Sequence, residues 1–222
     1  MTKQVVLFGK GELAVKIAGY FLHSQNFDLK LVVPVIPEPK WTDSLVNWCV
    51  ENDVPFIESG NYVDIPEEMK VELAVSIYYS NIFKKWFIDK CGKIINLHNA
   101  PLPKYRGGSP INWALKNKEK THGVTIHEIT PGIDDGPIIS QVNFSIYPET
   151  DEVKDVLNRC YDFGWVLFQQ TIERLDDIAS MPQDESKALY YSKKQNELLG
   201  ERRYFTREES REKMKNQANA IS

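Results

Sequence analysis

The central stretch of the sequence reads Lys93-Ile-Ile-Asn-Leu-His-Asn-Ala-Pro-Leu-Pro-Lys-Tyr-Arg-Gly-Gly-Ser-Pro110. It begins as an apolar run typical of a buried strand and ends in a segment with three prolines and two glycines, too many for a helix or a regular strand. Amide and imidazole side chains stand at the junction, namely Asn96, His98 and Asn99. A stiff loop therefore holds polar groups at the C-terminal end of a strand, where open α/β sheets bind their ligands.

Asn96 and His98 are two residues apart, so in a strand both side chains point to the same face of the sheet. An amide that donates hydrogen bonds beside an imidazole that accepts a proton suits an addition to a carbonyl. Such a histidine works best with a carboxylate that holds its tautomer and raises its pKa. Asp134, in the turn 132–136, is the candidate. Taken alone, the pattern would also fit an asparagine that caps a turn and a buried core histidine.

Apolar periodicity over the rest of the chain predicts an α/β protein with a mostly parallel, Rossmann-like sheet flanked by helices. The dinucleotide fingerprint G-x-G-x-x-G is absent because position 14 is alanine, so NAD is not expected. Thr150 is expected to cap a long helix. We expect a catalytic domain over 1–180 and a C-terminal β-hairpin with a tail over 181–222. The predicted strands are 4–8, 28–36, 54–57, 73–79, 93–98, 123–129, 137–144 and, in the hairpin, 189–194 and 203–206; the predicted helices are 12–22, 44–51, 83–90 and 151–175.

Composition limits the classes of protein to consider. The chain has 222 residues, 42% of them hydrophobic and 26% charged, which is typical of a globular protein with a full core. The net charge of −4 without a basic block argues against a nucleic-acid surface, and no apolar run is long enough to span a bilayer. Three cysteines without paired or metal-like spacing and no His/Cys cluster predict a reduced, cytoplasmic protein without a bound metal.

A set of motifs makes the interpretation specific: Asn96-Leu-His98, Leu102-Pro-Lys-Tyr-Arg-Gly107, Pro110-Ile-Asn-Trp-Ala114, Gly123-Val-Thr-Ile-His127 and Asp134-Asp-Gly-Pro-Ile138. Together they resemble the formyltransferases that use 10-formyltetrahydrofolate. That family includes methionyl-tRNA formyltransferase, glycinamide ribonucleotide transformylase and the nucleotide-sugar N-formyltransferases. The resemblance covers about residues 74–142 and extends more weakly back to residue 4.

The resemblance implies roles for individual residues. It makes Asn96, His98 and Asp134 the catalytic set, and it places the folate formyl donor against Ser80, Ile82, Thr130 and Asp134. Independently of the family, Lys104 and Arg106 lie on the stiff loop and Lys10 lies in the turn after the first strand, so we expect all three along the path of substrate phosphates. For Lys10 a plain surface role is an equal alternative, and for Arg106 a loop-shaping role is. His127 is expected to pack in its strand or to support the site indirectly.

The predicted acceptor is the primary amine of a nucleotide-linked amino sugar, most specifically a dTDP-4-amino-4,6-dideoxyhexose for surface polysaccharide (O-antigen) synthesis. The segment 106–114 resembles the tRNA and sugar branches, and the chain is too short and too acidic for the extra domain of the tRNA enzymes. Glycinamide ribonucleotide formylation is the alternative with the same chemistry, and a non-catalytic folate-binding module is the alternative from another class. Tyrosines and a phenylalanine in the predicted hairpin favour a homodimer.

Overall fold

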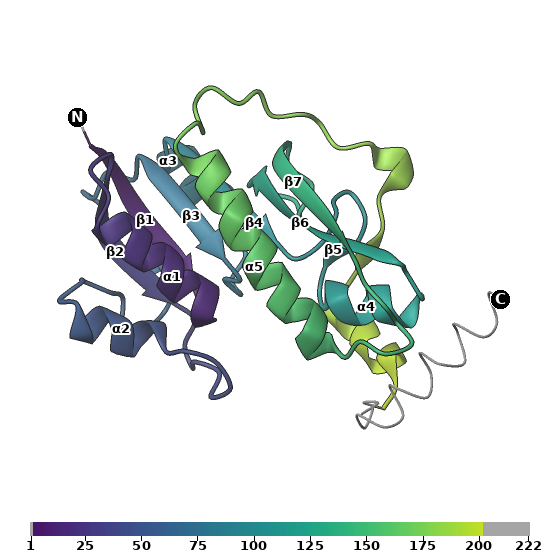
Figure 1. The fold of residues 1–222 in the computed structure, drawn as a ribbon. Helices are drawn as coiled ribbons and strands as arrows, with labels where there is room; N and C mark the ends of the chain where they lie inside the picture. Colours follow the sequence, from purple (N-terminus) through teal and green to yellow (C-terminus); the bar gives the residue numbers. More distant parts are fainter. Residues whose placement is uncertain (1, 202–222) are drawn as a thin grey trace.

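The structure, a computed structural model, describes residues 2–201 and is built on a six-stranded sheet with the order β2-β1-β3-β4-β6-β7 (Figure 1). β2, β1, β3 and β4 run parallel, while β4–β6 and β6–β7 pair antiparallel. The predicted mostly parallel α/β fold is therefore confirmed. The strands are β1 (Lys3–Gly9), β2 (Phe27–Pro34), β3 (Leu73–Ile77), β4 (Lys93–His98), β5 (Arg106–Gly107), β6 (Thr121–Glu128), β7 (Ile138–Ser145) and β8 (Tyr190–Tyr191).

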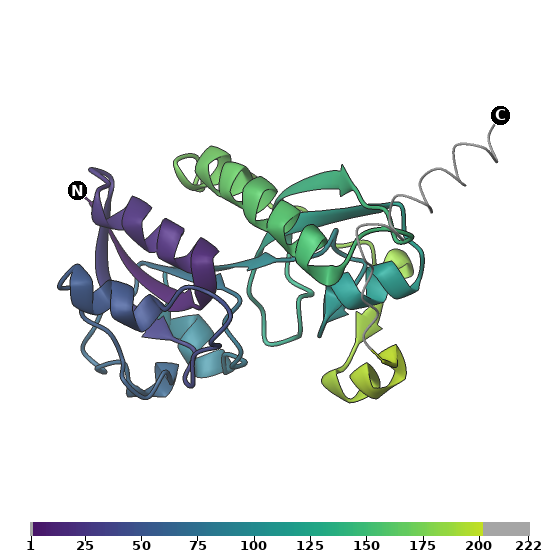
Figure 2. The ribbon, with the colours of Figure 1, turned by 60° about the horizontal axis from the view of Figure 1, so that its bottom comes forward.

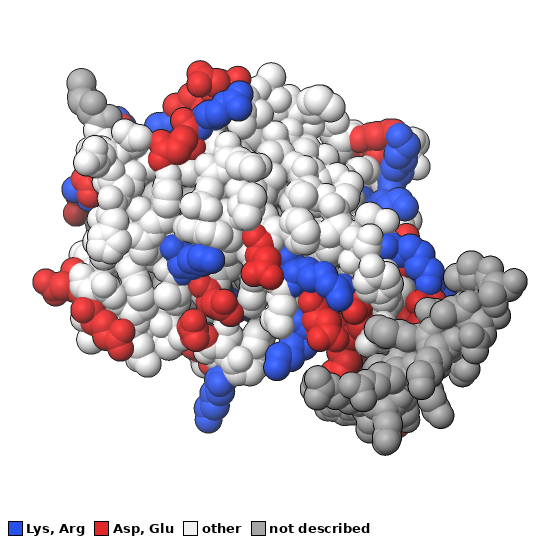
Figure 3. Space-filling view, in the orientation of Figure 1, with Lys and Arg blue, Asp and Glu red and all other residues white. Residues whose placement is uncertain are grey.

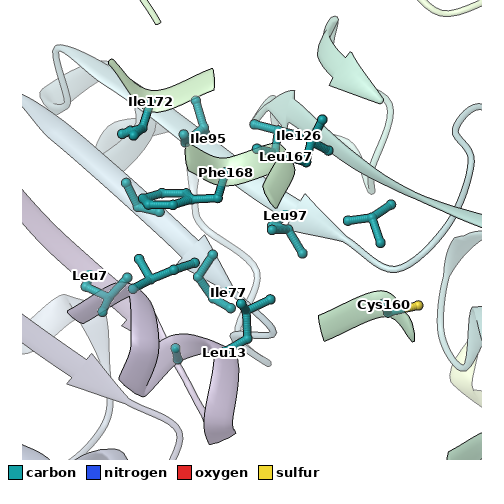
Figure 4. Packing of buried hydrophobic residues seen from close by; sticks show 14 of the residues in the cluster. Leu7, Leu13, Ile77, Ile95, Leu97, Ile126, Cys160, Leu167, Phe168 and Ile172 are labelled. Carbon is teal, nitrogen blue, oxygen red and sulfur yellow. The ribbon is translucent and has the colours of Figure 1, made fainter. Parts of the chain in front are cut away.

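Helices cover both faces of the sheet (Figure 2). On one face α1 and α5 bury the larger core cluster; in Figure 4 Phe168 of α5 lies among side chains from β1, β3 and β4. On the other face α3 closes a smaller aromatic cluster in which Phe8, Phe83 and Phe87 stack edge-on or in parallel. The helices are α1 (Gly11–Leu22), α2 (Leu45–Glu51), α3 (Lys85–Lys90), α4 (Pro110–Lys116) and α5 (Val153–Ile172), with short 3-10 turns η1 (Tyr62–Asp64), η2 (Glu185–Lys187) and η3 (Lys193–Leu199).

Three predicted elements differ in the structure. Of the predicted strand 189–194 only Tyr190–Tyr191 is a strand, and a 3-10 helix begins at Lys193. The segment 54–57 forms one bridge, between Phe56 and Val32, instead of a strand. The long helix begins at Val153 rather than at 151, because Glu152 and Asp155 cap each other's backbone N–H groups. Thr150 does not cap it; its hydroxyl faces the Tyr147 carbonyl at 3.4 Å.

The chain that follows α5 passes β7 and reaches α4 (Figure 1). Met181 and Ile138 exchange two backbone hydrogen bonds of 2.8 Å. β8 then pairs in parallel with β5, and the Tyr191 ring stacks on Trp113 at 4.2 Å between centroids. This small second sheet is the described part of the predicted appendage; the second predicted hairpin strand, 203–206, lies outside the described residues. Within 2–201, no helix has both the length and the apolarity to cross a membrane.

Candidate active site

The end of β4 carries the first two site residues. β4 lies between β3 and β6, with Asn96 opposite His127 of β6 and His98 opposite Thr125. Asp134 lies in the turn between β6 and β7, which returns over the end of β4. The structure thus brings together Asn96, His98 and Asp134, which are 38 or fewer positions apart in the sequence but come from two different elements.

The two ring nitrogens of His98 have different partners. Nε2 lies 2.9 Å from the Tyr105 carbonyl oxygen, and since a carbonyl can only accept, Nε2 carries the proton. Nδ1 therefore holds the lone pair, and it faces Asp134 Oδ2 at 3.6 Å. The tautomer is fixed by the Tyr105 carbonyl rather than by Asp134, which corrects the sequence-based interpretation. Asp134 is placed to stabilise the imidazolium that forms when Nδ1 takes a proton.

Asp134 is held as an anion. Burial by itself would raise the pKa of its carboxyl, but the positive charge of His98 and His127 when their rings are protonated, together with the backbone N–H of Gly107, outweighs burial and lowers the pKa well below its usual value. The Gly107 N–H donates to Oδ2 at 2.8 Å, so the loop after β4 and the turn after β6 are joined through this carboxylate. The side chain remains 17% exposed, which leaves one side open to a ligand.

Asn96 is oriented by His127. His127 Nδ1 lies 2.8 Å from the Glu128 carbonyl and must donate to it, so Nε2 of the neutral ring is an acceptor. The Asn96 amide nitrogen lies 3.1 Å from that Nε2 and donates to it. An amide nitrogen has two hydrogens, and the second remains available for an oxygen of a bound molecule. His127 is 2% exposed on its side chain and supports the site indirectly, as expected from the sequence.

Gln183 is a site-supporting residue that sequence reasoning missed. Its side-chain amide donates to the carbonyl oxygens of Asp134 and Gly136, at 2.8 and 2.7 Å, and so holds the turn that carries the carboxylate. No local motif marks it, because it lies in a connecting segment after α5. Its role arises only when that segment passes over the turn.

Backbone strain is concentrated around these side chains. Four residues other than glycine adopt the left-handed region here, namely Tyr78, Tyr105, Ser109 and Asp134, with φ between 51° and 64°. Such conformations cost free energy and persist where the surrounding structure enforces them, frequently at functional sites. Tyr78 follows β3, and its hydroxyl donates to the Asn99 side chain at 2.5 Å, just after β4.

The residues expected at the folate follow strands that end at opposite edges of the sheet: β3 ends beside Leu97, whereas β6, antiparallel to β4, ends beside Ile95. Ser80 and Ile82 follow β3 and are exposed, Ile82 at 63%. Thr130 follows β6, where its hydroxyl donates to the Asp135 carboxylate. Asp134 lies between the β6 end and the His98 ring. The turn after β6 brings Asp134 back to His98, whereas Thr130 stays near the start of β4, so the folate contacts of these four residues remain a prediction.

The three basic side chains expected to bind substrate phosphates have different surroundings in the structure. Lys10 lies with its ammonium 3.3 Å from Ser80 Oγ, and Lys104 is half exposed, 3.8 Å from Glu119. The Arg106 guanidinium donates to Gln183 at 2.8 and 3.0 Å and to Glu185 at 2.7 and 3.0 Å. Its side chain is only 9% exposed. These contacts match the loop-shaping alternative for Arg106, so we do not retain the phosphate role.

Fold and site together define an α/β protein with an amide donor and a histidine–carboxylate pair at the carboxyl edge of its sheet. Residues 59–172, slightly more than half of the chain, match the family described as Formyl transferase. The chain belongs to this formyl transferase family.

Curated relatives fall into more than one branch of it. The bifunctional polymyxin resistance protein ArnA of Wigglesworthia glossinidia brevipalpis is 40% identical over 114 residues, 50% of this chain and 17% of that protein. A methionyl-tRNA formyltransferase of Pseudothermotoga lettingae is 33% identical over 147 residues, 65% of this chain and 47% of that protein. The chain thus spans less than half the length of either relative.

Solved structures show the same fold. The N-formyltransferase of Helicobacter canadensis, in complex with folinic acid and dTDP-3-aminofucose, superposes with a TM-score of 0.75 at 27% identity, covering 87% of this chain and 72% of that one. The phosphoribosylglycinamide formyltransferase of Bacillus halodurans superposes with a TM-score of 0.65 at 22% identity, covering 78% of this chain and 95% of that one. At 22% identity, the similarity to the second structure supports the shared fold only.

Proposed function

We propose that the protein transfers a formyl group from 10-formyltetrahydrofolate to the primary amine of a nucleotide-linked amino sugar. The observation that carries this proposal is the convergence of Asn96, His98 and Asp134, with His98 Nδ1 unprotonated and 3.6 Å from the carboxylate. Family membership supplies the class of reaction, and the folinic acid bound to the Helicobacter canadensis enzyme supports a folate donor.

On the basis of this geometry we propose a role for each group. The neutral amine attacks the formyl carbon, and the second amide hydrogen of Asn96 donates to the oxygen of the tetrahedral intermediate. His98 Nδ1 takes the proton that the amine loses, and Asp134 stabilises the resulting imidazolium. The bond from the formyl carbon to the folate N10 then breaks, and that nitrogen takes a proton. Asn96, His98 and Asp134 are accordingly the proposed catalytic residues.

The acceptor is the finer part of the proposal. The dTDP-amino sugar bound by the Helicobacter canadensis enzyme supports a nucleotide sugar as the acceptor. Our specific choice is a dTDP-4-amino-4,6-dideoxyhexose for surface polysaccharide. We propose that the reaction takes place in the cytoplasm. Methionyl-tRNA is a second candidate because several curated relatives are methionyl-tRNA formyltransferases. Glycinamide ribonucleotide is a third, favoured by the shared fold.

A panel assay tests the acceptor. The purified protein is incubated with 10-formyltetrahydrofolate and, in parallel, dTDP- and UDP-linked 3- and 4-amino sugars, glycinamide ribonucleotide and methionyl-tRNA. We expect the mass gain of one formyl group on an amino sugar. Turnover of glycinamide ribonucleotide or methionyl-tRNA with all sugars unreacted would overturn the choice of acceptor. An absence of any turnover, with folate still bound, would favour the non-catalytic module.

We also propose that residues 1–180 form the catalytic domain and that the segment 181–222 supports a homodimer. Tyr190 is half exposed, whereas Tyr191 is used within the chain, stacked between Trp113 and Tyr105. The predicted contributions of Tyr204 and Phe205 lie outside the described residues. Multi-angle light scattering at micromolar concentration should give the mass of two chains; the mass of one chain would contradict the dimer.

A further inference from the structure

Tyr105, whose carbonyl fixes the tautomer of His98, is itself held by the C-terminal segment. This residue adopts the left-handed region, with φ 64°, and its side chain is buried. A residue with a Cβ rarely adopts this conformation, so surrounding contacts must enforce it. Leu189, just before β8, bonds to the backbone on both sides. Its N–H donates to the Pro103 carbonyl at 3.2 Å, and its carbonyl accepts from the Arg106 N–H at 2.8 Å.

The ring and the hydroxyl of Tyr105 are fixed as well. Its ring lies nearly parallel to that of Tyr191 in β8, with centroids 5.8 Å apart, and Tyr191 in turn stacks on Trp113 at 4.2 Å. Asn117, the C-terminal cap of α4, joins the two tyrosines, since its side-chain nitrogen lies 3.2 Å from the Tyr105 hydroxyl and 3.0 Å from the Tyr191 hydroxyl. An amide nitrogen has two hydrogens, so it can donate to both. The Tyr105 hydroxyl donates to the Glu119 carboxylate at 2.8 Å.

The orientation of the Tyr105 carbonyl decides whether His98 can act as a base. A neutral imidazole has one ring proton, and two acceptors compete for it here. The carbonyl oxygen lies 2.9 Å from Nε2, within hydrogen-bond distance, whereas Asp134 Oδ2 lies 3.6 Å from Nδ1. If the carbonyl turned away, the proton would leave Nε2 and be carried on Nδ1, where the carboxylate favours it. Nδ1 could then no longer take the proton of the attacking amine.

The charge of the surface does not make this choice. Basic and acidic side chains are interspersed over the face in Figure 3, and the net charge of the chain is −4. Without an extended field of one sign, the nearest acceptors determine which ring nitrogen carries the proton. The contacts that orient the Tyr105 carbonyl therefore select the tautomer of His98.

We propose that Tyr191 is a positioning residue for His98, because it holds Tyr105 in the conformation whose carbonyl keeps the proton on Nε2. This inference rests on the proposed function and deepens it, since it makes β8 a part of the catalytic apparatus. Tyr191 lies beyond the proposed catalytic domain, residues 1–180, and it acts through the Tyr105 ring rather than on the substrate.

The test measures the tautomer of His98 by nuclear magnetic resonance and needs no acceptor. The full chain is isotope-labelled at its histidine ring nitrogens. The chain has four histidines, so the signals are few, and a His98→Gln variant assigns those of His98. Spectra at about pH 9, where an ordinary histidine ring is neutral, show which ring nitrogen carries the proton.

Three variants probe the contact, and one serves as the control. Tyr191→Leu removes the stacked ring, Tyr191→Phe keeps the ring without its hydroxyl, and Asn117→Ala removes the link between the two hydroxyls. Tyr147→Leu is the matched control, since Tyr147 is 54% exposed and lies in the connection between β7 and α5. Thermal unfolding of each variant confirms that the fold is retained.

In wild type we expect the proton of His98 on Nε2. Tyr191→Leu should move a measurable share of it to Nδ1. With the acceptor found in the panel assay, its kcat should fall about tenfold, as is typical of the loss of one aromatic pair or one hydrogen bond. Tyr191→Phe should restore most of both, and Asn117→Ala should lie between Tyr191→Leu and wild type. Tyr147→Leu should match wild type in tautomer and kcat.

The tautomer decides the outcome. A Tyr191→Leu variant in which His98 keeps the wild-type tautomer would overturn the positioning role even if kcat falls, because that fall would then have a purely structural cause. If Tyr191→Leu does not fold, Asn117→Ala takes its place: an unchanged tautomer overturns the proposal and a shifted one supports it.

The positioning role and the proposed function fail separately. A shifted tautomer in a protein that formylates none of the amino sugars would support the positioning role and overturn the proposed acceptor. An unshifted tautomer in a protein that does formylate them would leave the proposed function in place and overturn the positioning role.

Discussion

The protonation of His98 follows from one backbone carbonyl. Tyr105 points its C=O at Nε2, and it does so from a left-handed conformation with φ 64°. That choice leaves Nδ1 unprotonated and directed at Asp134, whose carboxylate can then stabilise the charged ring. The Tyr105 carbonyl fixes the tautomer of His98, and the Asp134 carboxylate stabilises the protonated ring. Together they keep the histidine ready to accept a proton.

Replacement of Asn96 tests the oxyanion role. Asn96→Ala should lower kcat about 10²- to 10³-fold, since removal of one oxyanion donor typically costs that much. The KM for the folate should change little, because the amide is proposed to bind the intermediate and not the ground state. Steady-state kinetics with the acceptor found in the panel assay measures both quantities. Asn143→Ala, at an exposed asparagine of β7, is the control; a kcat of Asn96→Ala near that of wild type would refute the assignment.

His122 makes folding stability depend on pH. It is fully buried, its Nε2 donates to the Asn99 carbonyl at 2.8 Å, and its Nδ1 has no hydrogen-bond partner among residues 2–201. Burial lowers the pKa of this imidazole to about 4. Below about pH 6.5 the unfolded chain binds a proton on this ring while the folded protein does not until about pH 4. The free energy of unfolding should therefore decrease as the pH falls through this window, by up to about 3 kcal/mol from this residue.

The measurement is urea unfolding of wild type and His122→Gln at several pH values from 7 to about 4. Glutamine retains an N–H for the Asn99 carbonyl but cannot take up the proton, so the variant should lose less stability on acidification than wild type does. His23→Gln, at an exposed position, controls for the loss of a histidine as such. Parallel stability curves for wild type and His122→Gln would show that this ring does not contribute.

At the scale of elements, three segments meet at Arg106. The guanidinium of β5 binds Gln183 and Glu185, and the Gln183 amide binds the carbonyls of Asp134 and Gly136. The loop after β4, the turn after β6 and the segment after α5 are thus joined in one network. Formation of the site therefore depends on the attachment of residues 181–187.

Arg106→Lys tests this structural role. Lysine cannot reproduce the planar fork of donors, so contacts to Gln183 and Glu185 are lost. We expect the Tm to fall by about 3–6 °C for a chain of this size. The KM for the nucleotide sugar should stay nearly constant. Lys104→Met, at an exposed lysine of the same loop, is the control for the Tm. A raised KM with an unchanged Tm would restore the phosphate role of Arg106.

At the scale of the molecule, α5 joins the two halves of the sheet. It packs against α1 on the parallel side and against β6 and β7 on the antiparallel side. Phe168 lies among buried side chains of the sheet in Figure 4. Its ring centroid is 5.5 Å from those of both Phe21 and Tyr20. The two parts of the sheet meet at β4, which is parallel to β3 and antiparallel to β6. The packing of α5 on both parts therefore holds β4 in place.

Phe168→Ala should destabilise the whole molecule. The side chain is fully buried, and removal of a buried phenylalanine typically costs about 3–5 kcal/mol because a cavity remains. Phe163→Ala on the same helix is the matched control, since Phe163 is 38% exposed and stacks on Phe144. Its cost should be markedly smaller. Urea unfolding at neutral pH measures both; equal losses for the two variants would contradict the central position of Phe168.

The sequence by itself determined the class of fold and predicted that Asn96, His98 and Asp134 lie together, as the structure shows. Apolar periodicity separates strands from helices because each element must bury one face. The pairing of Asn96 with His98 could be predicted because residues two positions apart in a strand point to the same face of the sheet. The motif set around them, with Asp134, matched a known family, and residues 59–172 confirm that membership.

Only the tertiary structure decided which groups support that site. Gln183 contacts Asp134 and Gly136 from a segment far away in the chain, and the Tyr105 carbonyl reaches His98 only because the loop after β4 turns back on the strand; no local pattern encodes either contact. Arg106 also shows that local sequence does not reveal the partner of a side chain. Its sequence context fitted a phosphate-binding role and a loop-shaping role equally well. The choice between those roles was made by Gln183 and Glu185, which reach Arg106 only because the chain after α5 folds back over the loop. Local propensity and periodicity act over a few residues, whereas the partner of a charged side chain is set by the packing of the whole chain.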